Sequence, residues 1–356
     1  MRLGVFLPNW IGDVVMATPA LRSLRRLAGD DGALVGVMRP YVSEVLAGQV
    51  AIDQVVLSGK NRRDAKTGSR AVVAQLREAQ LDGIVLLTNS LRTAWLAWRS
   101  GAPERIGFVR DWRGPLLTTR LYEPRRRRRL APLPTIDSYL NVAYAAGGPW
   151  ESPRLELATT PADEAAADAV WNELNLPGGE RVVVFNTGGA FGSVKSWPAA
   201  HFAQLARRVV ADHDLHVLVN CGPAERDVAR EIVELSADPR VASLADFDVP
   251  LGLSKAVIKR SRLLVTTDSG PRFFGIAFGK PVVTLFGPTG PALTATHTLL
   301  EQCLTLQLDC QPCMARTCPL GHHRCMQDLG VDRVAAAVRQ ALDVPVSHSV
   351  LPRQVA

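Results

Sequence analysis

The sequence has no hydrophobic run long enough to span a membrane. Its apolar stretches all fall short of the roughly 20 residues that a transmembrane helix requires. The first residues also lack the pattern of a secretion signal, because Pro8 and Asp13 interrupt the apolar stretch before any small-residue cleavage site. We therefore expect a protein that remains in the cytoplasm.

Two common signatures of nucleotide-binding proteins are absent as well. The order Gly-Lys-Ser/Thr of a P-loop does not occur, and no Gly-x-Gly-x-x-Gly follows the first predicted strand at 3–7. ATP hydrolysis and dinucleotide binding of the Rossmann type are therefore disfavoured. The sequence also lacks a recognisable nucleic-acid-binding motif, so we expect no nucleic acid partner.

The net charge of +7 comes partly from five consecutive arginines at 125–129. Such a block is often a solvated loop. Alternatively, it contacts an acidic acceptor or anionic lipid headgroups, where each basic residue contributes about 1 kcal/mol. The second interpretation predicts peripheral contact with a membrane surface.

Short apolar runs alternate with helical patterns along the 356 residues. This alternation predicts parallel strands with helices on both faces of a sheet, the doubly wound α/β class. The pattern starts a second time after residue 160, so we predict two facing domains at 1–160 and 161–356 with a central cleft. Ligands of this class bind at the carboxyl ends of strands, here the loops at 8–13, 186–196, 220–225 and 266–270.

Residues 263–288 predict a strand, a tight turn, a helix and a second strand. The turn contains Asp268, Ser269 and Gly270, and Pro271 suits the first turn of the helix. A helix that begins there points free backbone N–H groups and its positive dipole end at the turn, which suits a phosphate. A helix cap without a ligand remains an alternative.

Three more side chains follow predicted strands. Lys195, in a glycine-bearing loop, can place a compact positive charge on a phosphate. Glu225 can accept hydrogen bonds from a ribose diol, and Asp13, beside Gly12, can act as a base. Each has an ordinary alternative, which is a solvated lysine for Lys195 and a helix-start carboxylate for the two acids.

Four of the six cysteines lie within residues 310–325, where they follow the spacing Cys310-x2-Cys313-x4-Cys318-x6-Cys325. In a cytosolic protein this density indicates a metal site or reduced thiols rather than disulfides. Thiolates at these intervals can form a tetrahedral site for zinc or iron, although the spacing is not that of a standard zinc finger. A structural metal and buried free thiols are both consistent with the sequence.

Several segments resemble a known family, glycosyltransferase family 9, which comprises ADP-heptose glycosyltransferases, and within it the lipopolysaccharide heptosyltransferase II branch. The resemblance spans nearly the whole chain and is specific, because its motifs occur in the same order. The matching segments are PNWIGDVVMATPALRSLRR, TNSLRTA, RIGF, GGAFGSVKSWPAAHFAQLA, TTDSGPRFFGIAFGKPVVTLFGPTGP and CQPCMARTCPLGHHRCM.

The resemblance implies a GT-B fold with two Rossmann-like domains, the first binding the acceptor and the second the donor. It implies that Asp13 is the general base and that Lys195 contacts the donor diphosphate as a catalytic residue. One branch of the family has a four-cysteine finger that holds iron, which favours a structural metal here. The expected donor-binding residues are Gly12, Lys195, Glu225, Asp268, Ser269, Gly270 and Arg272.

The activity implied by this resemblance is inverting transfer of heptose from ADP-L-glycero-D-manno-heptose to the anionic inner core of lipopolysaccharide, without a catalytic metal. The enzyme would work in the cytoplasm, peripherally at the inner membrane. Phe273 departs from the family, whose members commonly have His there, and Phe cannot donate a hydrogen bond to the leaving diphosphate. A different nucleotide sugar, a weakened nucleotide-sugar-binding homologue and an epimerase of the same fold therefore remain alternatives.

Overall fold

The computed structural model describes residues 1–126, 129–131, 133–188 and 193–343. The chain divides into two compact units. Unit 1 comprises Met1–Ala158 with Leu293–Ala295, and unit 2 comprises Thr159–Ala292 with Thr296–Ala356. In the described part of the chain, no helix combines the length and the apolar character that crossing a membrane requires.

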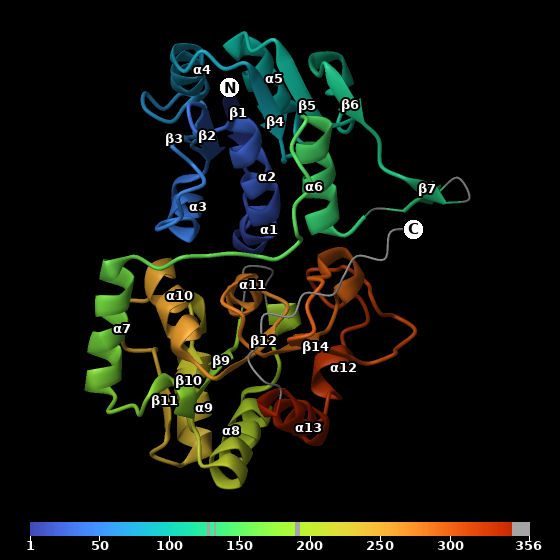
Figure 1. Ribbon diagram of the computed structural model, residues 1–356. Helices are drawn as coiled ribbons and strands as arrows, with labels where there is room; N and C mark the ends of the chain where they lie inside the picture. Colours follow the sequence, from blue (N-terminus) through green and yellow to red (C-terminus); the bar gives the residue numbers. More distant parts are fainter. Residues whose placement is uncertain (127–128, 132, 189–192, 344–356) are drawn as a thin grey trace. The chain divides into compact units, whose positions relative to one another are not determined.

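The sheet of unit 1 has the strand order β3-β2-β1-β4-β5-β6, and every neighbouring pair is parallel (Figure 1). This order is that of a doubly wound nucleotide-binding fold. The strands are β1 (Arg2–Phe6), β2 (Ala33–Met38), β3 (Gln54–Leu57), β4 (Gly83–Leu86), β5 (Glu104–Phe108) and β6 (Thr119–Leu121). A short antiparallel pair, β7 (Arg125–Arg126) and β8 (Arg129–Leu130), follows the sheet.

The helices of unit 1 cover the sheet with their apolar sides. On one face, α4 and α5 pack side by side and share a core with side chains of β2 and β4. The helix α2 packs against α6. The helices are α1 (Ile11–Met16), α2 (Thr18–Ala28), α3 (Pro40–Val45), α4 (Ser69–Glu78), α5 (Leu91–Ser100) and α6 (Thr135–Ala145).

The sheet of unit 2 repeats the arrangement with the order β11-β10-β9-β12-β13-β14, again entirely parallel. All residues of β9, β12 and β13 are buried, as expected for strands covered on both faces. The strands are β9 (Val182–Asn186), β10 (His216–Asn220), β11 (Val241–Ser243), β12 (Leu263–Thr267), β13 (Val282–Phe286) and β14 (Glu301–Thr305).

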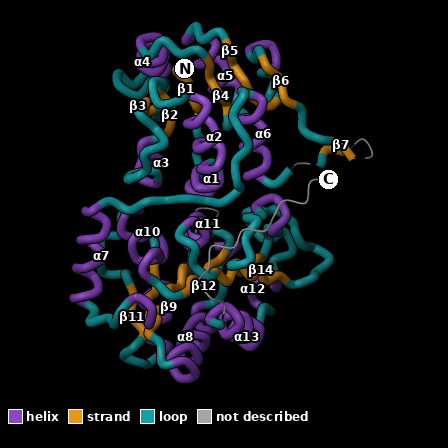
Figure 2. The backbone as a smooth tube through the Cα atoms, in the orientation of Figure 1, coloured by secondary structure: helices purple, strands orange, loops and turns teal. Residues whose placement is uncertain are grey.

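The helices of unit 2 alternate with its strands along the chain (Figure 2). The first of them begins with a capping box, in which the side chains of Thr160 and Asp163 bond to each other's backbone N–H groups. The helices are α7 (Pro161–Glu173), α8 (Ala199–His213), α9 (Arg226–Ser236), α10 (Leu251–Arg260), α11 (Gly270–Ala277), α12 (Arg324–Gln327) and α13 (Val331–Leu342).

The predicted doubly wound α/β class is confirmed in both units. The apolar positions from Val14 to Leu27 fit one helix face, but the structure has two helices there, which meet at Ala17. The break occurs because Pro19 lacks a backbone N–H and therefore starts a new helix more readily than it continues an old one. The short strands β3, β5, β6, β7, β8, β11 and β14 and the helices α5, α12 and α13 were not predicted.

Candidate functional site

Lys195 and Asp268 form an ion pair at the carboxyl ends of the strands in unit 2. Lys195 ends a short 3₁₀ turn, Ser193–Lys195, and Asp268 directly follows β12. The Lys195 Nζ lies 2.7 Å from the Asp268 Oδ2 and also donates to the Asp268 backbone carbonyl at 2.6 Å. Both side chains are largely buried, with 12% and 9% exposed. The structure thus joins two residues that the sequence assigned to the donor phosphates.

Asp268 is an ionised carboxylate with further partners. The Arg272 Nη1 lies 3.2 Å from its Oδ1, and the Thr289 hydroxyl donates to its Oδ2 at 2.7 Å. Burial raises the pKa of Asp268, but the positive charges of Lys195 and Arg272 outweigh this effect. The pKa of Asp268 therefore lies below its usual value, and the carboxylate stays charged at neutral pH.

Arg272 is fully buried behind Asp268. Its Nε and Nη2 atoms pair with the two carboxylate oxygens of Glu301 at 2.5 and 3.0 Å. The rings of Phe273 and Phe286 lie 4.8 and 4.9 Å from its guanidinium carbon. Phe273 is therefore part of the packing that holds Arg272, and the predicted donor contact of Arg272 remains a prediction.

A network of buried amides and hydroxyls fixes the turn before α11. The Asn186 amide donates to the hydroxyls of Ser269 and Thr266 at 3.1 and 3.3 Å, and it receives a hydrogen bond from the Asn220 amide at 3.0 Å. Ser269 is the N-cap residue, and its side chain makes no cap hydrogen bond to the first turn of α11. The N–H groups at this helix start, beginning with that of Gly270, suit an anion.

Glu225 and Gly188 bring the loops after β10 and β9 into contact. Glu225 is half-buried at the end of a 3₁₀ turn, where α9 begins. A Cβ atom on Gly188 would lie 2.4 Å from the Glu225 Cγ, a distance that real side chains do not tolerate. Because Gly188 has no side chain, the Glu225 side chain can pack against its backbone. The rest of the predicted glycine loop, residues 189–192, lies outside the described residues.

Asp13 and Gly12 belong to α1 in unit 1. Asp13 is half-buried in the first turn of that helix, where the helix dipole favours a negative charge. Burial raises the pKa of Tyr139 well above its usual value, and the charge of Asp13 raises it further. Asp13 therefore lies near a tyrosine that stays protonated. Its predicted role as the base remains a prediction.

The four clustered cysteines show some features of a metal site but not its geometry. The Cys318 sulfur accepts a hydrogen bond from the His323 N–H at 3.4 Å, and such N–H groups lower its pKa. Burial raises the pKa of Cys325, and the nearby Cys313, Cys310 and Cys318 raise it further. Within the described residues, however, no three His, Cys, Asp or Glu side chains are close enough to hold an ion. The structural metal remains a prediction.

The sequence did not identify several residues that complete this site. Thr284 and Thr296 donate to the two oxygens of Glu301 at 2.6 and 2.7 Å. Thr289, which holds Asp268, lies in the segment after β13 that resembles the family. Its place inside that segment was a usable signal for Thr289, whereas Glu301 begins a strand that lacks any recognisable motif.

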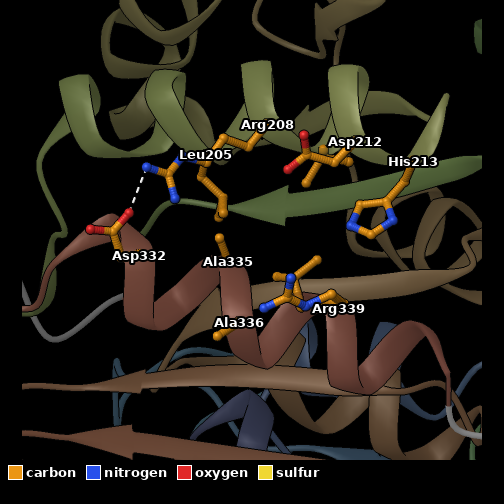
Figure 3. Close-up of a pocket in the computed structure, with 10 residues that line it drawn as sticks. Leu205, Arg208, Asp212, His213, Asp332, Ala335, Ala336 and Arg339 are labelled. Atoms are coloured by element: carbon orange, nitrogen blue, oxygen red, sulfur yellow. Dashed lines mark ion pairs between the residues drawn. The ribbon is translucent and has the colours of Figure 1, made fainter.

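A pocket of about 400 Å³ lies elsewhere in unit 2, between α8 and α13 (Figure 3). The Arg208 guanidinium and the Asp332 carboxylate form an ion pair across it at 2.5 Å. None of the residues that line this pocket is a predicted site residue. It is therefore separate from the predicted donor site.

Comparison with known proteins gives consistent results over almost the whole chain. Lipooligosaccharide heptosyltransferase 2 of Campylobacter jejuni is 26% identical over 345 residues, which are 96% of this chain and 98% of that protein. The structure of Escherichia coli ADP-heptose lps heptosyltransferase II matches with a TM-score of 0.76 at 22% identity, and covers 96% of this chain and 98% of its own. E. coli heptosyltransferase WaaC, solved with ADP-2-deoxy-2-fluoro heptose, has a TM-score of 0.64 at 19% identity, with 96% and 98% covered.

These structural likenesses confirm the predicted GT-B-like fold of two parallel α/β sheets. The sequence model of glycosyltransferase family 9 (heptosyltransferase) matches residues 69–324, well over half of the chain. That match includes the loop with Lys195 and the turn with Asp268, the two residues of the ion pair described above. The chain therefore belongs to glycosyltransferase family 9, the heptosyltransferases.

Proposed function

We propose that this protein transfers heptose from ADP-heptose to the inner core of lipopolysaccharide and inverts the configuration at the anomeric carbon. The observation that carries the proposal is the buried pair of Lys195 and Asp268 beside the start of α11, in a chain of the heptosyltransferase family. A cation and free helix N–H groups together suit a sugar diphosphate. The solved complex of the E. coli relative with an ADP-heptose analogue supports the same donor class.

The donor binds at the strand ends of unit 2 in this proposal. Lys195 and the N–H groups around Ser269 and Gly270 stabilise the negative charge that gathers on departing ADP. Glu225 receives hydrogen bonds from the ribose hydroxyls. The charge stabilisation comes from groups of the protein itself, so the proposed mechanism assigns no step to a metal.

Asp13 is the general base of the proposed reaction. It removes a proton from the acceptor hydroxyl as that oxygen forms a bond to the anomeric carbon, and the bond from this carbon to the ADP oxygen breaks. Attack opposite to the leaving group produces inversion. General-base assistance of this kind contributes about 10²–10⁴-fold to the rate.

Three arginines of unit 1 support an anionic acceptor. Arg39 directly follows β2, Arg92 lies in the first turn of α5, and Arg62 lies in the loop after β3. Burial lowers the pKa of Arg92, and the charges of Arg39 and Arg62 lower it further. Within the residues that the structure describes, none of the three forms an ion pair with a carboxylate. Phosphate or carboxylate groups of the inner core would relieve this repulsion.

Mass spectrometry after incubation with ADP-heptose and a truncated, heptose-bearing lipopolysaccharide core tests the proposal. We expect the acceptor to gain the mass of one heptose. The Asp13→Ala variant should form no product while its affinity for ADP stays the same, whereas Asp31→Ala, at an exposed turn of unit 1, should act like the native enzyme. Native turnover by Asp13→Ala would exclude Asp13 as the base.

Phe273 favours a second candidate function, that of a nucleotide-sugar-binding homologue with weakened catalysis. The ring is 4% exposed and stacks on Arg272, and it cannot donate a hydrogen bond to a leaving diphosphate. Binding of ADP without transfer from any donor would support this candidate. A panel of nucleotide sugars separates it from a transferase that uses a different donor.

A further inference from the structure

The helix α5 of unit 1 exposes three large apolar side chains on one side. Leu91, Trp95 and Trp98 are 47%, 41% and 48% exposed, and their spacing of four and three residues places them in one row along the helix. The side of α5 that faces away from this row, with Leu96 and Ala97, is buried in the core that it shares with α4. Adjacent exposed tryptophans are unusual on a soluble protein and indicate an interaction surface.

Arg99 combines a positive charge with this aromatic row. Its guanidinium carbon lies 5.9 Å from the centroid of the Trp95 ring and 6.0 Å from that of Trp98, so it contacts both rings. The Arg77 side chain of α4 donates to the Arg99 backbone carbonyl at 3.1 Å. A second exposed arginine therefore lies at the same end of α5.

The charge of the chain is concentrated in the part that carries α5. Residues 1–158 contain 23 Lys and Arg against 14 Asp and Glu. Residues 159–356 contain 18 Lys and Arg against 20 Asp and Glu. All of the excess positive charge thus belongs to unit 1, which favours an anionic partner for its surface.

We propose that the α5 face, consisting of Leu91, Trp95, Trp98 and Arg99, docks on the surface of an anionic phospholipid bilayer. Tryptophan rings favour the headgroup level of a bilayer, where their apolar bodies are buried and their N–H groups stay hydrated. Arg99 reaches lipid phosphates from the same position, and the positive excess of unit 1 attracts the anionic surface. The helix then lies in the plane of the membrane.

This proposal differs from the contact expected of the arginine block at 125–129, because it depends on aromatic side chains as well as charge. It does not depend on which sugar the enzyme transfers. Binding should therefore weaken but persist at high salt, since salt screens the charges and leaves the burial of apolar surface intact.

Flotation of the full chain with lipid vesicles tests the proposal. We expect binding to vesicles of about one part phosphatidylglycerol to two parts phosphatidylcholine, and weaker binding to phosphatidylcholine alone. The Trp95→Ser/Trp98→Ser variant should bind at least about tenfold more weakly, because two apolar side chains no longer insert. The matched control is Trp150→Ser, which removes a 66% exposed tryptophan outside α5 and should bind like the native protein.

A second set of measurements separates the alternatives. Thermal unfolding must first show that the double variant is folded. Lipids with bromine-labelled acyl chains should then quench the tryptophan fluorescence of the native protein more than that of this variant. Native binding by the double variant would overturn the proposal. So would sedimentation showing a native dimer that the double variant cannot form, because α5 would then contact a second copy. A third outcome also overturns the proposal. If a variant without the arginines at 125–129 no longer bound vesicles while the double variant bound them fully, the attraction to the membrane would come from charge alone.

Discussion

Arg272 and Glu301, 29 positions apart in the sequence, form a two-point ion pair in which neither side chain reaches solvent appreciably. Arg272 also pairs with Asp268, which in turn holds Lys195. Two cations and two carboxylates therefore form one connected, electrically balanced cluster behind the start of α11. This cluster fixes the turn that we assign to the donor phosphates.

Replacement of Arg272 by methionine tests how much the protein depends on this cluster. Arg272→Met leaves Glu301 and Asp268 buried without their shared cation, so we expect the free energy of unfolding to fall by about 3–5 kcal/mol. Urea denaturation measures this loss. The control is Arg230→Met, because Arg230 pairs with Asp227 and Asp246 at the exposed surface and its replacement should change the stability little. An equal fall in the free energy of unfolding in the two variants would contradict the prediction that the buried ion pairs of Arg272 matter more than the exposed pairs of Arg230.

The Asp268→Asn variant should show a pH-dependent loss of stability. The folded protein lowers the pKa of Asp268, so the ionised carboxylate contributes stability above its unfolded pKa of about 3.9. This contribution disappears as the pH falls through the lower pKa of the folded state. We expect Asp268→Asn to be about 2–4 kcal/mol less stable than the native protein between roughly pH 5 and 8, with a smaller difference below roughly pH 4.

Urea denaturation at a series of pH values measures this dependence. Asp227→Asn is the control, because the Asp227 carboxylate is fully exposed and should change stability little at any of these values. A difference between Asp268→Asn and the native protein that stayed constant down to strongly acid pH would show that ionisation of Asp268 is not the cause.

An alanine at position 188 should weaken ADP binding without unfolding the protein. The new Cβ would lie 2.4 Å from the Glu225 Cγ, so the Glu225 side chain must move from the position proposed for the ribose. We expect calorimetry to show roughly tenfold weaker binding of ADP, about the loss of one good hydrogen bond to a charged group. Gly330→Ala, at a glycine with open space around it, should keep native affinity. Native affinity in Gly188→Ala would remove Glu225 from the donor site.

The cysteine segment predicts a bound structural metal that elemental analysis can detect. We expect about one zinc or iron ion per chain, held by thiolates as in other four-cysteine sites. Cys325→Ser should lose most of the metal, whereas Cys303→Ser, outside the cluster and exposed, should keep it. Metal-free protein with unchanged thermal stability in a chelator would favour the alternative of free thiols.

The sequence by itself determined the class of fold and indicated the segments to which we assign the donor. Residues 263–288 predicted a strand, turn, helix and strand, and the structure contains β12, α11 and β13 there. The succession of apolar, glycine and proline residues along this segment was sufficient for the prediction, because the types of neighbouring residues favour helix or strand locally. The motifs around Lys195 and Asp268 also indicated the family.

Only the tertiary structure decided which side chains meet. The contact of Lys195 with Asp268 spans 73 positions, and it arises because parallel pairing of β9 with β12 brings their carboxyl ends together. No local pattern indicated that Glu301 would be buried against Arg272, or that the tryptophans of α5 would face solvent. Burial depends on neighbours that are distant in the sequence, and those neighbours are set by the packing of the whole unit.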